Sequence, residues 1–128
     1  MTIPHLLKER KEILKKNNIR VFLDEFELTR YKLAQIIGTS ERNIHRWMQD
    51  TDIRPQHNFI RRLKKLEELK YWLKKVIKEE DIGKWLNTPN SGLGDRTPIK
   101  EISSMENPED GMQTIINLLK DIQDGTFT

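Results

Sequence analysis

A long apolar stripe in the middle of the chain constrains the fold more than any other feature of the sequence. Between residues 56 and 80, large apolar side chains recur every three or four positions: Phe59, Leu63, Leu66, Leu69, Trp72, Leu73, Val76 and Ile77. This spacing matches the α-helical turn, so these side chains share one face of a helix that must be buried against other elements. We expect the basic residues between them to lie largely in water: Arg61, Arg62, Lys64, Lys65, Lys74 and Lys75.

Start and stop signals of helices divide the rest of the chain into shorter segments. We expect a first helix from Pro4 to the Asn17-Asn18 break and a second from Ile19 to Phe26. Further starts are expected at Pro55, Asp81, Thr97-Pro98 and Asn107-Pro108, and helix ends at Gly38, Pro89 and Gly125. No segment alternates polar and apolar residues as a strand would, so the sequence predicts an all-α fold.

Length and composition exclude several classes of protein. The chain has 128 residues, of which 35% are hydrophobic and 34% charged, which suits one compact unit in two parts. It contains no cysteine, so it can have neither a disulfide nor a thiolate ligand or nucleophile. No run approaches the roughly 18 apolar residues of a membrane span, and the first residues lack the apolar core of a signal peptide. We therefore expect a cytoplasmic protein that does not contact a membrane.

The net charge of +3 is distributed unevenly along the chain. Residues 1–80 carry 19 Lys and Arg against 12 Asp and Glu, whereas residues 81–128 carry 4 against 8. A basic half of this kind is typical of a protein that meets a polyanion, although two ordinary solvated surfaces would give the same counts.

The segment from residue 29 to residue 50 reads as two short helices joined by a tight turn. Thr29 and Ser40 are expected to cap the two helices, and Gly38 is expected to form the turn between them. Four apolar residues are spaced to close a small core, namely Leu33, Ile37, Ile44 and Trp47, and the small Ala34 lets the helices approach. This pattern predicts a helix-turn-helix unit, whose second helix enters the major groove of double-stranded DNA.

The second helix of this unit exposes residues that can read bases. Arg bonds guanine, Asn bonds adenine and Glu accepts from cytosine, so we expect base contacts from Ser40, Glu41, Arg42, Asn43 and Arg46. Arg30, Lys32 and Thr39 are better placed for phosphates. One unit buries too little surface to be selective, so we expect a homodimer. A plain helical hairpin, or a module whose basic helices dock an acidic protein, remains as an alternative.

Neither a metal site nor a catalytic site is indicated. The histidines at positions 5, 45 and 57 lie far apart in sequence and have no metal-ligand spacing. The segment "PNSGLGDRTP" lacks the lysine of a phosphate-binding loop and the serine spacing of a nucleophile elbow. We expect no catalytic residue, no metal and no cofactor, and we expect the three tryptophans to be core residues.

The same segment, residues 89–98, is expected to form a loop of fixed shape. Pro89 ends the preceding helix, Gly92 and Gly94 permit backbone angles closed to other residues, and Thr97-Pro98 restarts a helix. The five donors of Arg96 can tie nearby carbonyl groups or Asp95 into one conformation.

This loop and the helix after it resemble the C-terminal toxin-binding domain of the MbcA/ParS/Xre antitoxins. The family pattern is Trp-Leu, Pro-Asn, Leu-Gly-Gly-Arg-Thr-Pro and a last helix that closes near a glycine. It falls here on Trp85, Leu86, Pro89, Asn90, Leu93, Gly94, Arg96, Thr97, Pro98 and Gly125. Together with the helix-turn-helix and the linking helix, the resemblance covers residues 28–126. Asp95 replaces the second glycine of the pattern, and "MENPED" at residues 105–110 makes a longer link.

The resemblance implies an antitoxin that occludes the active site of an NAD-degrading RES-domain toxin and represses its own operon. It implies toxin contacts from Asn90, Leu93, Gly94, Arg96, Thr97, Lys120, Gln123, Asp124 and Gly125. The expected organisation is an N-terminal helix (residues 1–18), a helix-turn-helix DNA-binding domain (19–55), a long linking helix (56–80) and a toxin-binding domain (81–128). The alternative is a solitary helix-turn-helix regulator without a toxin partner.

Overall fold

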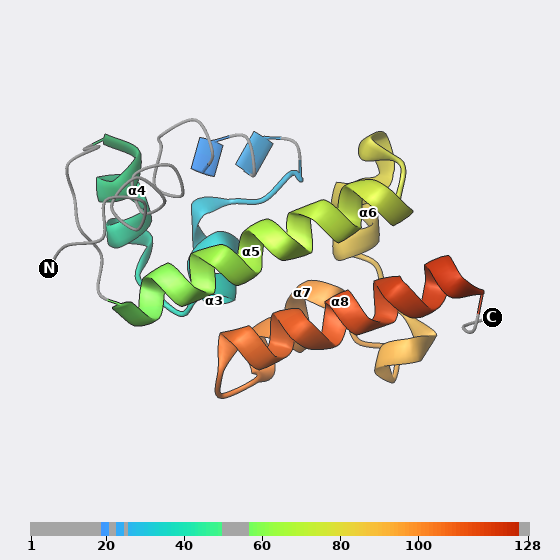
Figure 1. The fold of residues 1–128 in the computed structure, drawn as a ribbon. Coiled ribbons are helices and arrows are strands. Elements are labelled where there is room, and N and C mark those ends of the chain that lie inside the picture. The colour runs from blue at the N-terminus through green and yellow to red at the C-terminus, as the bar shows by residue number, and fades with distance from the viewer. Residues whose placement is uncertain (1–18, 21–22, 25, 50–56, 126–128) are drawn as a thin grey trace, which may run out of the picture.

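Helices dominate the structure, a computed structural model that describes residues 19–20, 23–24, 26–49 and 57–125 (Figure 1). They are α3 (Arg30–Ile37), α4 (Glu41–Gln49), α5 (His57–Val76), α6 (Ile82–Leu86), α7 (Pro98–Ser104) and α8 (Pro108–Asp124), with short 3-10 turns η1 (Glu79–Asp81) and η2 (Ser91–Leu93). Within these residues the only strand-like pairing is an isolated bridge between Asn90 and Arg96. The all-α prediction is therefore confirmed. The expected helix in residues 1–18 and the expected start at Pro55 lie outside the described residues.

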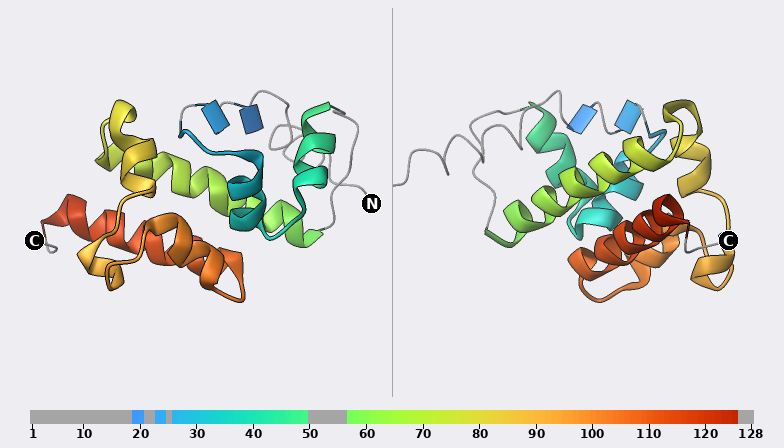
Figure 2. Two further views of the ribbon diagram at one scale, coloured as in Figure 1. Left: turned by 180° about the vertical axis from the view of Figure 1, so that it is seen from behind. Right: turned by 45° about the vertical axis from the view of Figure 1, so that its right-hand side comes forward.

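The two long helices, α5 and α8, lie side by side and run in the same direction (Figures 1 and 2). Two polar contacts join the N-terminal halves of these helices: Arg61 pairs with Glu109 at 3.2 Å, and the ammonium group of Lys65 donates to Oε1 of Gln113 at 2.6 Å. Both pairs join residues 48 positions apart. Because the sequence separation is the same in both pairs, α5 and α8 run parallel and keep one alignment along this part of their length.

One continuous core holds both parts of the chain together. Half of the predicted stripe is buried, with Leu69 and Leu73 almost completely enclosed, and Ile60, which the stripe did not include, is buried as well. The other stripe residues are half-buried and pack against the core: Phe59, Trp72, Val76 and Ile77. Met112, Ile115, Ile116 and Leu119 of α8 are fully buried in the same cluster. Helix α3 packs against α5, α7 and α8. The helix expected to link two parts is thus the shared centre of one core.

Two of the basic residues of α5 do not lie in water as expected. Arg62 and Lys65 are half-buried. The Nη1 group of Arg62 donates hydrogen bonds to the carbonyl oxygens of Ile37 and Gly38, both at 3.2 Å, and so satisfies carbonyls at the end of α3. Its guanidinium also lies 5.5 Å from the centre of the Phe59 ring. Arg62 is therefore a packing residue between α5 and the turn that follows α3.

The close approach of α7 and α8 depends on Gly111. A Cβ atom at this position would lie 2.7 Å from Cα of Ile102 and 2.9 Å from its carbonyl oxygen. Distances below 3.0 Å to backbone atoms cannot be relieved by a side-chain rotation. The absence of a side chain at residue 111 therefore sets how tightly these two helices pack.

Most helix caps are those that the sequence predicts. The hydroxyl groups of Thr29, Ser40 and Thr97 accept from the backbone N–H groups of Lys32, Asn43 and Lys100, respectively, at 3.0 to 3.1 Å. Asn107 caps α8, which ends at Gly125. The cap expected from Asp81 is wrong. Helix α6 does begin after Asp81, but the Asp81 side chain makes no capping hydrogen bond, because η1 leads directly into α6.

In the part of the chain that the structure describes, no helix combines the length and the apolar character needed to cross a bilayer.

Candidate functional site

The turn between α3 and α4 has the geometry predicted for a helix-turn-helix unit. Gly38 adopts φ +77°, a left-handed conformation that glycine accepts without strain, and its N–H donates to the carbonyl oxygen of Ala34 at 2.8 Å. The N–H of Thr39 donates to the same oxygen at 3.0 Å. Inside the unit, Ile44 is fully buried and Trp47 is 3% exposed. The apolar residues therefore anchor α4 and leave its other face free.

The free face of α4 carries the residues expected to read bases. Ser40, Glu41, Arg42 and Arg46 are exposed, and Asn43 is half-buried. The amide of Asn43 donates to Oγ1 of Thr39 at 2.9 Å, and Nη1 of Arg46 donates to the Asn43 amide oxygen at 3.4 Å. These contacts align the three side chains along the start of α4. The first turns of this helix thus present a guanidinium, an amide and a carboxylate to solvent.

Arg30 and Lys32, two of the three residues expected to bind phosphates, differ in position. Arg30 is exposed, and its Nη1 lies 3.0 Å from Nδ1 of the exposed His45, which joins the start of α3 to α4. Lys32 is half-buried, and its ammonium group donates to the side-chain oxygen of Asn87 at 2.7 Å. Lys32 therefore connects α3 to the end of α6, and of the two only Arg30 extends the exposed surface of α4.

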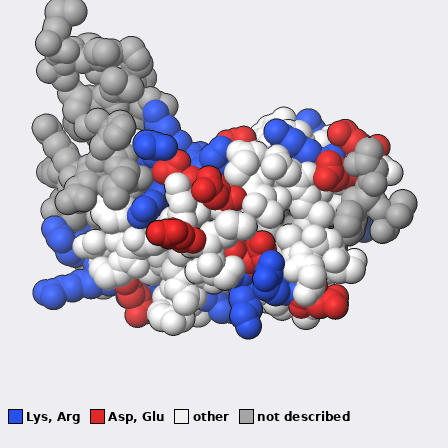
Figure 3. Space-filling model, turned by 90° about the horizontal axis from the view of Figure 1, so that it is seen from below, with Lys and Arg blue, Asp and Glu red and all other residues white. Residues whose placement is uncertain are grey.

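Basic side chains gather at the end of the molecule where α4 lies. Figure 3 shows Lys and Arg side chains at the left-hand end of the face seen from below, which is the end occupied by α4 and the start of α5 in Figure 1. Among the described residues of these two helices, Arg42 and Arg46 of α4 and Arg61 of α5 are exposed, and Arg61 exposes 60% of its side chain. The structure thus brings the positive charge of two separate segments to one end of the fold.

The loop between α6 and α7 is held in one shape by its own backbone and by Asn90. The N–H of Asn90 donates to the carbonyl oxygen of Arg96 at 3.1 Å, and the N–H of Asp95 donates back to the carbonyl oxygen of Asn90 at 3.0 Å. The Asn90 side chain accepts from the N–H of Gly92 at 2.9 Å. Gly94 and Asp95 adopt φ +62° and φ +65°. Asp95 therefore occupies a conformation that glycine prefers, which explains a glycine at this place in the family pattern.

Arg96 pairs with a carboxylate that the sequence did not single out. Its Nε lies 2.6 Å from Oε2 of Glu101, whereas the expectation was a contact with Asp95 or with carbonyl groups. Glu101 is only 6% exposed, and this Oε2 atom makes no hydrogen bond of good geometry in the described residues, so the contact is an ion pair. It ties the loop to the first turns of α7. No local sequence signal marks Glu101, because its burial results from the packing of α7.

The residues implied as toxin contacts divide into exposed and anchoring ones. Gly94, Arg96, Gln123, Asp124 and Gly125 are exposed, and Asn90 and Lys120 are half-buried. The Leu93 side chain is 6% exposed and belongs to the core, and the Thr97 hydroxyl is used as the cap of α7. Leu93 and Thr97 therefore fix the shape of the loop. The exposed residues lie on the outer surface of the loop and at the end of α8.

The two sets of candidate residues lie at opposite ends of the molecule. In Figures 1 and 2, α4 lies at one end, whereas the loop with η2 and the last turn of α8 lie toward the other. Among the residues that the structure describes, no three His, Asp or Glu side chains gather to hold a metal ion. The arrangement can place two large partners on one chain without overlap.

These features define an all-α protein with a loop of fixed shape between α6 and α7 and an exposed last turn of α8. Residues 73–125 match the family described as the antitoxin Xre/MbcA/ParS C-terminal toxin-binding domain. The family model and the loop motif therefore agree that residues 73–125 form a domain of this kind.

The fold is also similar to that of a solved structure, described as the crystal structure of the M. tuberculosis MbcT-MbcA toxin-antitoxin complex. The matched chain is 22% identical, with a TM-score of 0.64, and the match covers 88% of the present chain and 96% of the other. The similarity therefore includes most of the helix-turn-helix part as well as the C-terminal domain. No curated protein matches the sequence.

Proposed function

We propose that the protein neutralises a RES-domain, NAD-degrading toxin by covering the cleft of its active site. The observation that carries this proposal is the match of residues 73–125 to a toxin-binding domain. The contact surface would consist of the exposed part of the loop at residues 90–97 and the last turn of α8, including Gln123 and Asp124. The ion pair of Arg96 and Glu101 keeps this loop in one shape, which lowers the entropy lost on binding.

We further propose that the chain represses transcription as a homodimer. Helix α4 would lie in the major groove, with Arg42, Asn43 and Arg46 on base edges and Arg30 on a phosphate. Support comes from the turn at Gly38, the buried Ile44 and Trp47 behind α4, and the basic end of the molecule. The proposed organisation is a DNA-binding part (residues 19–55) and a toxin-binding part (81–128), joined by residues 56–80 and preceded by residues 1–18.

Co-expression tests the antitoxin proposal. The probe is the product of the gene adjacent to the one that encodes this chain, expressed alone and together with it in growing bacteria. We expect growth arrest and NAD depletion with the neighbour alone, and recovery of both when the chain is present. Continued NAD depletion in the presence of folded chain would refute neutralisation. A harmless neighbour would favour the alternative of a solitary regulator.

A pair of double variants separates the two activities. We expect Arg42→Ala/Arg46→Ala to abolish binding to the DNA upstream of the gene in a gel-shift titration, while neutralisation persists, because both residues lie on α4. Gln123→Arg/Asp124→Arg should give the reverse result. Substitutions are preferable to removal of α8, since α8 supplies fully buried core residues such as Ile115 and Ile116. If either double variant folds but loses both DNA binding and neutralisation, the two activities do not depend on separate parts of the chain.

A further inference from the structure

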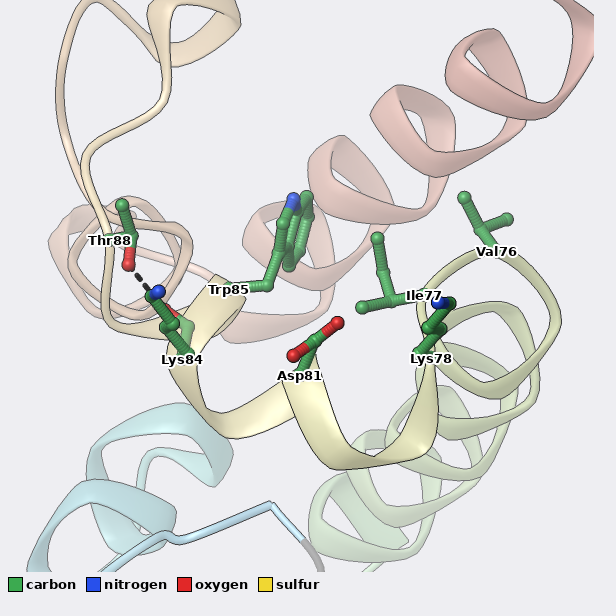
Figure 4. Close-up of a pocket in the computed structure, with 7 residues that line it drawn as sticks. All are labelled: Val76, Ile77, Lys78, Asp81, Lys84, Trp85 and Thr88. Atoms are coloured by element: carbon green, nitrogen blue, oxygen red, sulfur yellow. Dashed lines mark hydrogen bonds between the residues drawn. The ribbon is translucent and has the colours of Figure 1, made fainter.

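An apolar groove with charged edges lies at the end of the molecule away from α4 (Figure 4). It has a volume of about 480 Å³ and lies between the end of α5, η1, α6 and the turn after α6. Val76, Ile77 and Trp85 are half-buried and supply apolar surface, and they pack against the core. Such a recess can take one large apolar side chain of a partner.

Three charged side chains line this groove. Lys78 and Lys84 line it together with a single carboxylate, that of Asp81, and all three side chains are exposed. None of the three forms an ion pair with another described residue. Among the side chains that line the groove, an incoming acidic group would therefore meet two positive charges and one negative charge.

A second cationic feature, which we call the basic platform, consists of Tyr71, Trp72, Lys75 and Lys120. The ammonium group of Lys75 lies 5.0 Å from the centre of the Trp72 ring, and that of Lys120, from α8, lies 5.3 Å from the same centre. Tyr71, 57% exposed, contacts the edge of the Trp72 ring with 5.5 Å between ring centres. The platform therefore joins α5 and α8 at the outer surface.

The two ammonium groups of the platform have no carboxylate partner among the described residues. Because both lie near one ring centre, they are separated by no more than about 10 Å, which is one Debye length at 0.1 M salt. Like charges at this separation repel each other, and an anionic group placed beside them would relieve the repulsion. The platform is thus suited to a carboxylate more than to a neutral partner.

The platform and the groove form one continuous surface. Val76, at the edge of the groove, lies one helical turn beyond Trp72, so both side chains are on the same side of α5. Lys120 lies one turn before Gln123 and Asp124, which belong to the proposed toxin contacts. The surface therefore extends the proposed toxin-binding region from α8 onto α5 and α6.

We propose that this surface binds a segment of the toxin in which one large apolar side chain is flanked by carboxylates. The apolar side chain would fill the groove beside Trp85, and the carboxylates would lie against Lys75, Lys120 and Lys84. This inference rests on the proposed antitoxin function and names the chemistry of the partner's segment. Duplex DNA fits the surface less well, because phosphates would satisfy the lysines and leave the apolar groove empty.

The three tryptophans provide a direct test. Nitrogen-15-labelled chain is titrated with the product of the adjacent gene, and the indole N–H signals are followed by NMR. We expect those of Trp72 and Trp85 to shift, whereas that of Trp47, on the buried face of α4 against Phe59, should stay in place. Dissociation constants are then compared for the wild-type chain and Lys75→Glu/Lys120→Glu, with Arg42→Glu/Arg46→Glu as a control of equal charge change.

The outcomes separate this inference from the antitoxin proposal. We expect the lysine double variant to bind the toxin at least about tenfold more weakly and with a smaller salt dependence, and the arginine control to bind as the wild type does. Wild-type binding that the lysine variant retains unchanged would overturn the inference alone. No binding by the wild-type chain would overturn both proposals. Loss of duplex DNA binding, but not toxin binding, in the lysine variant would assign the surface to DNA.

Discussion

The guanidinium group of Arg62 donates a hydrogen bond to the carbonyl oxygen of Gly38 at 3.2 Å. This contact joins the long helix α5 to the turn that sets the angle between α3 and α4. A Cβ atom on Gly38 would lie 2.9 Å from Cγ of Pro108, at the start of α8, and 3.0 Å from Nη1 of Arg62. The turn of the candidate DNA-binding unit is therefore enclosed by the two helices that form the centre of the core.

Replacement of Arg62 should weaken DNA binding without removing a DNA contact. We expect Arg62→Met to lower the free energy of unfolding by about 1–3 kcal/mol, because two carbonyl oxygens lose a charged donor while the apolar stem is kept. Denaturant unfolding measures the first effect and a gel-shift titration the second. The neighbouring Arg61→Met is the control, since its exposed ion pair with Glu109 should contribute at most about 1 kcal/mol. Equal effects of the two substitutions would contradict the role given to Arg62.

A methyl group at residue 111 should disturb the packing of α7 on α8. We expect Gly111→Ala to lower the free energy of unfolding by about 1–3 kcal/mol, because the new Cβ would meet the backbone of Ile102 at 2.7 Å. Gly125→Ala is the comparison: its Cβ would meet nothing within 4 Å, and only its φ of +72° opposes the change. That substitution should cost roughly 1 kcal/mol. A Gly111→Ala protein as stable as the wild type in thermal unfolding would disprove the close contact.

The ion pair between Arg96 and Glu101 should appear in a double-mutant cycle. Arg96→Ala leaves a carboxylate that is 6% exposed without its cation, so it should destabilise the protein more than Arg96→Ala does in the Glu101→Gln background. Since the Arg96 side chain is 53% exposed, solvent screens the pair, and we expect a coupling energy of only about 1 kcal/mol. Urea unfolding of the four proteins gives this value. Additive effects of the two substitutions would show that the contact does not stabilise the loop.

The backbone at residue 95 should tolerate glycine better than alanine. Asp95 adopts φ +65°, where a side chain opposes the conformation. We expect Asp95→Gly to leave the free energy of unfolding within about 1 kcal/mol of the wild type, because relief of strain offsets the greater freedom of the unfolded chain. Asp95→Ala should be the less stable of the two variants in chemical unfolding. The reverse order would mean that the Asp95 side chain, and not the backbone, determines the loop.

Local features of the sequence determined the helices and the face that α4 exposes. The caps at Thr29, Ser40 and Thr97 and the turn at Gly38 each depend on residues within four positions, so they can be read directly from the chain. The burial of Ile44 and Trp47 follows in the same way from helical spacing. The loop motif from Trp85 to Pro98 was sufficient to indicate the family that residues 73–125 match.

Only the tertiary structure decided which distant residues meet. Lys32 meets Asn87 across 55 positions, Arg62 meets Gly38 across 24, and Lys120 meets Trp72 because α5 and α8 run parallel. Helical spacing assigned Arg62 to the solvent side, and no spacing predicted a buried Glu101. The physical reason is that an amphipathic pattern fixes which face of a helix is buried. It leaves open the partner, direction and register of that face, and these depend on how all the faces pack around one core.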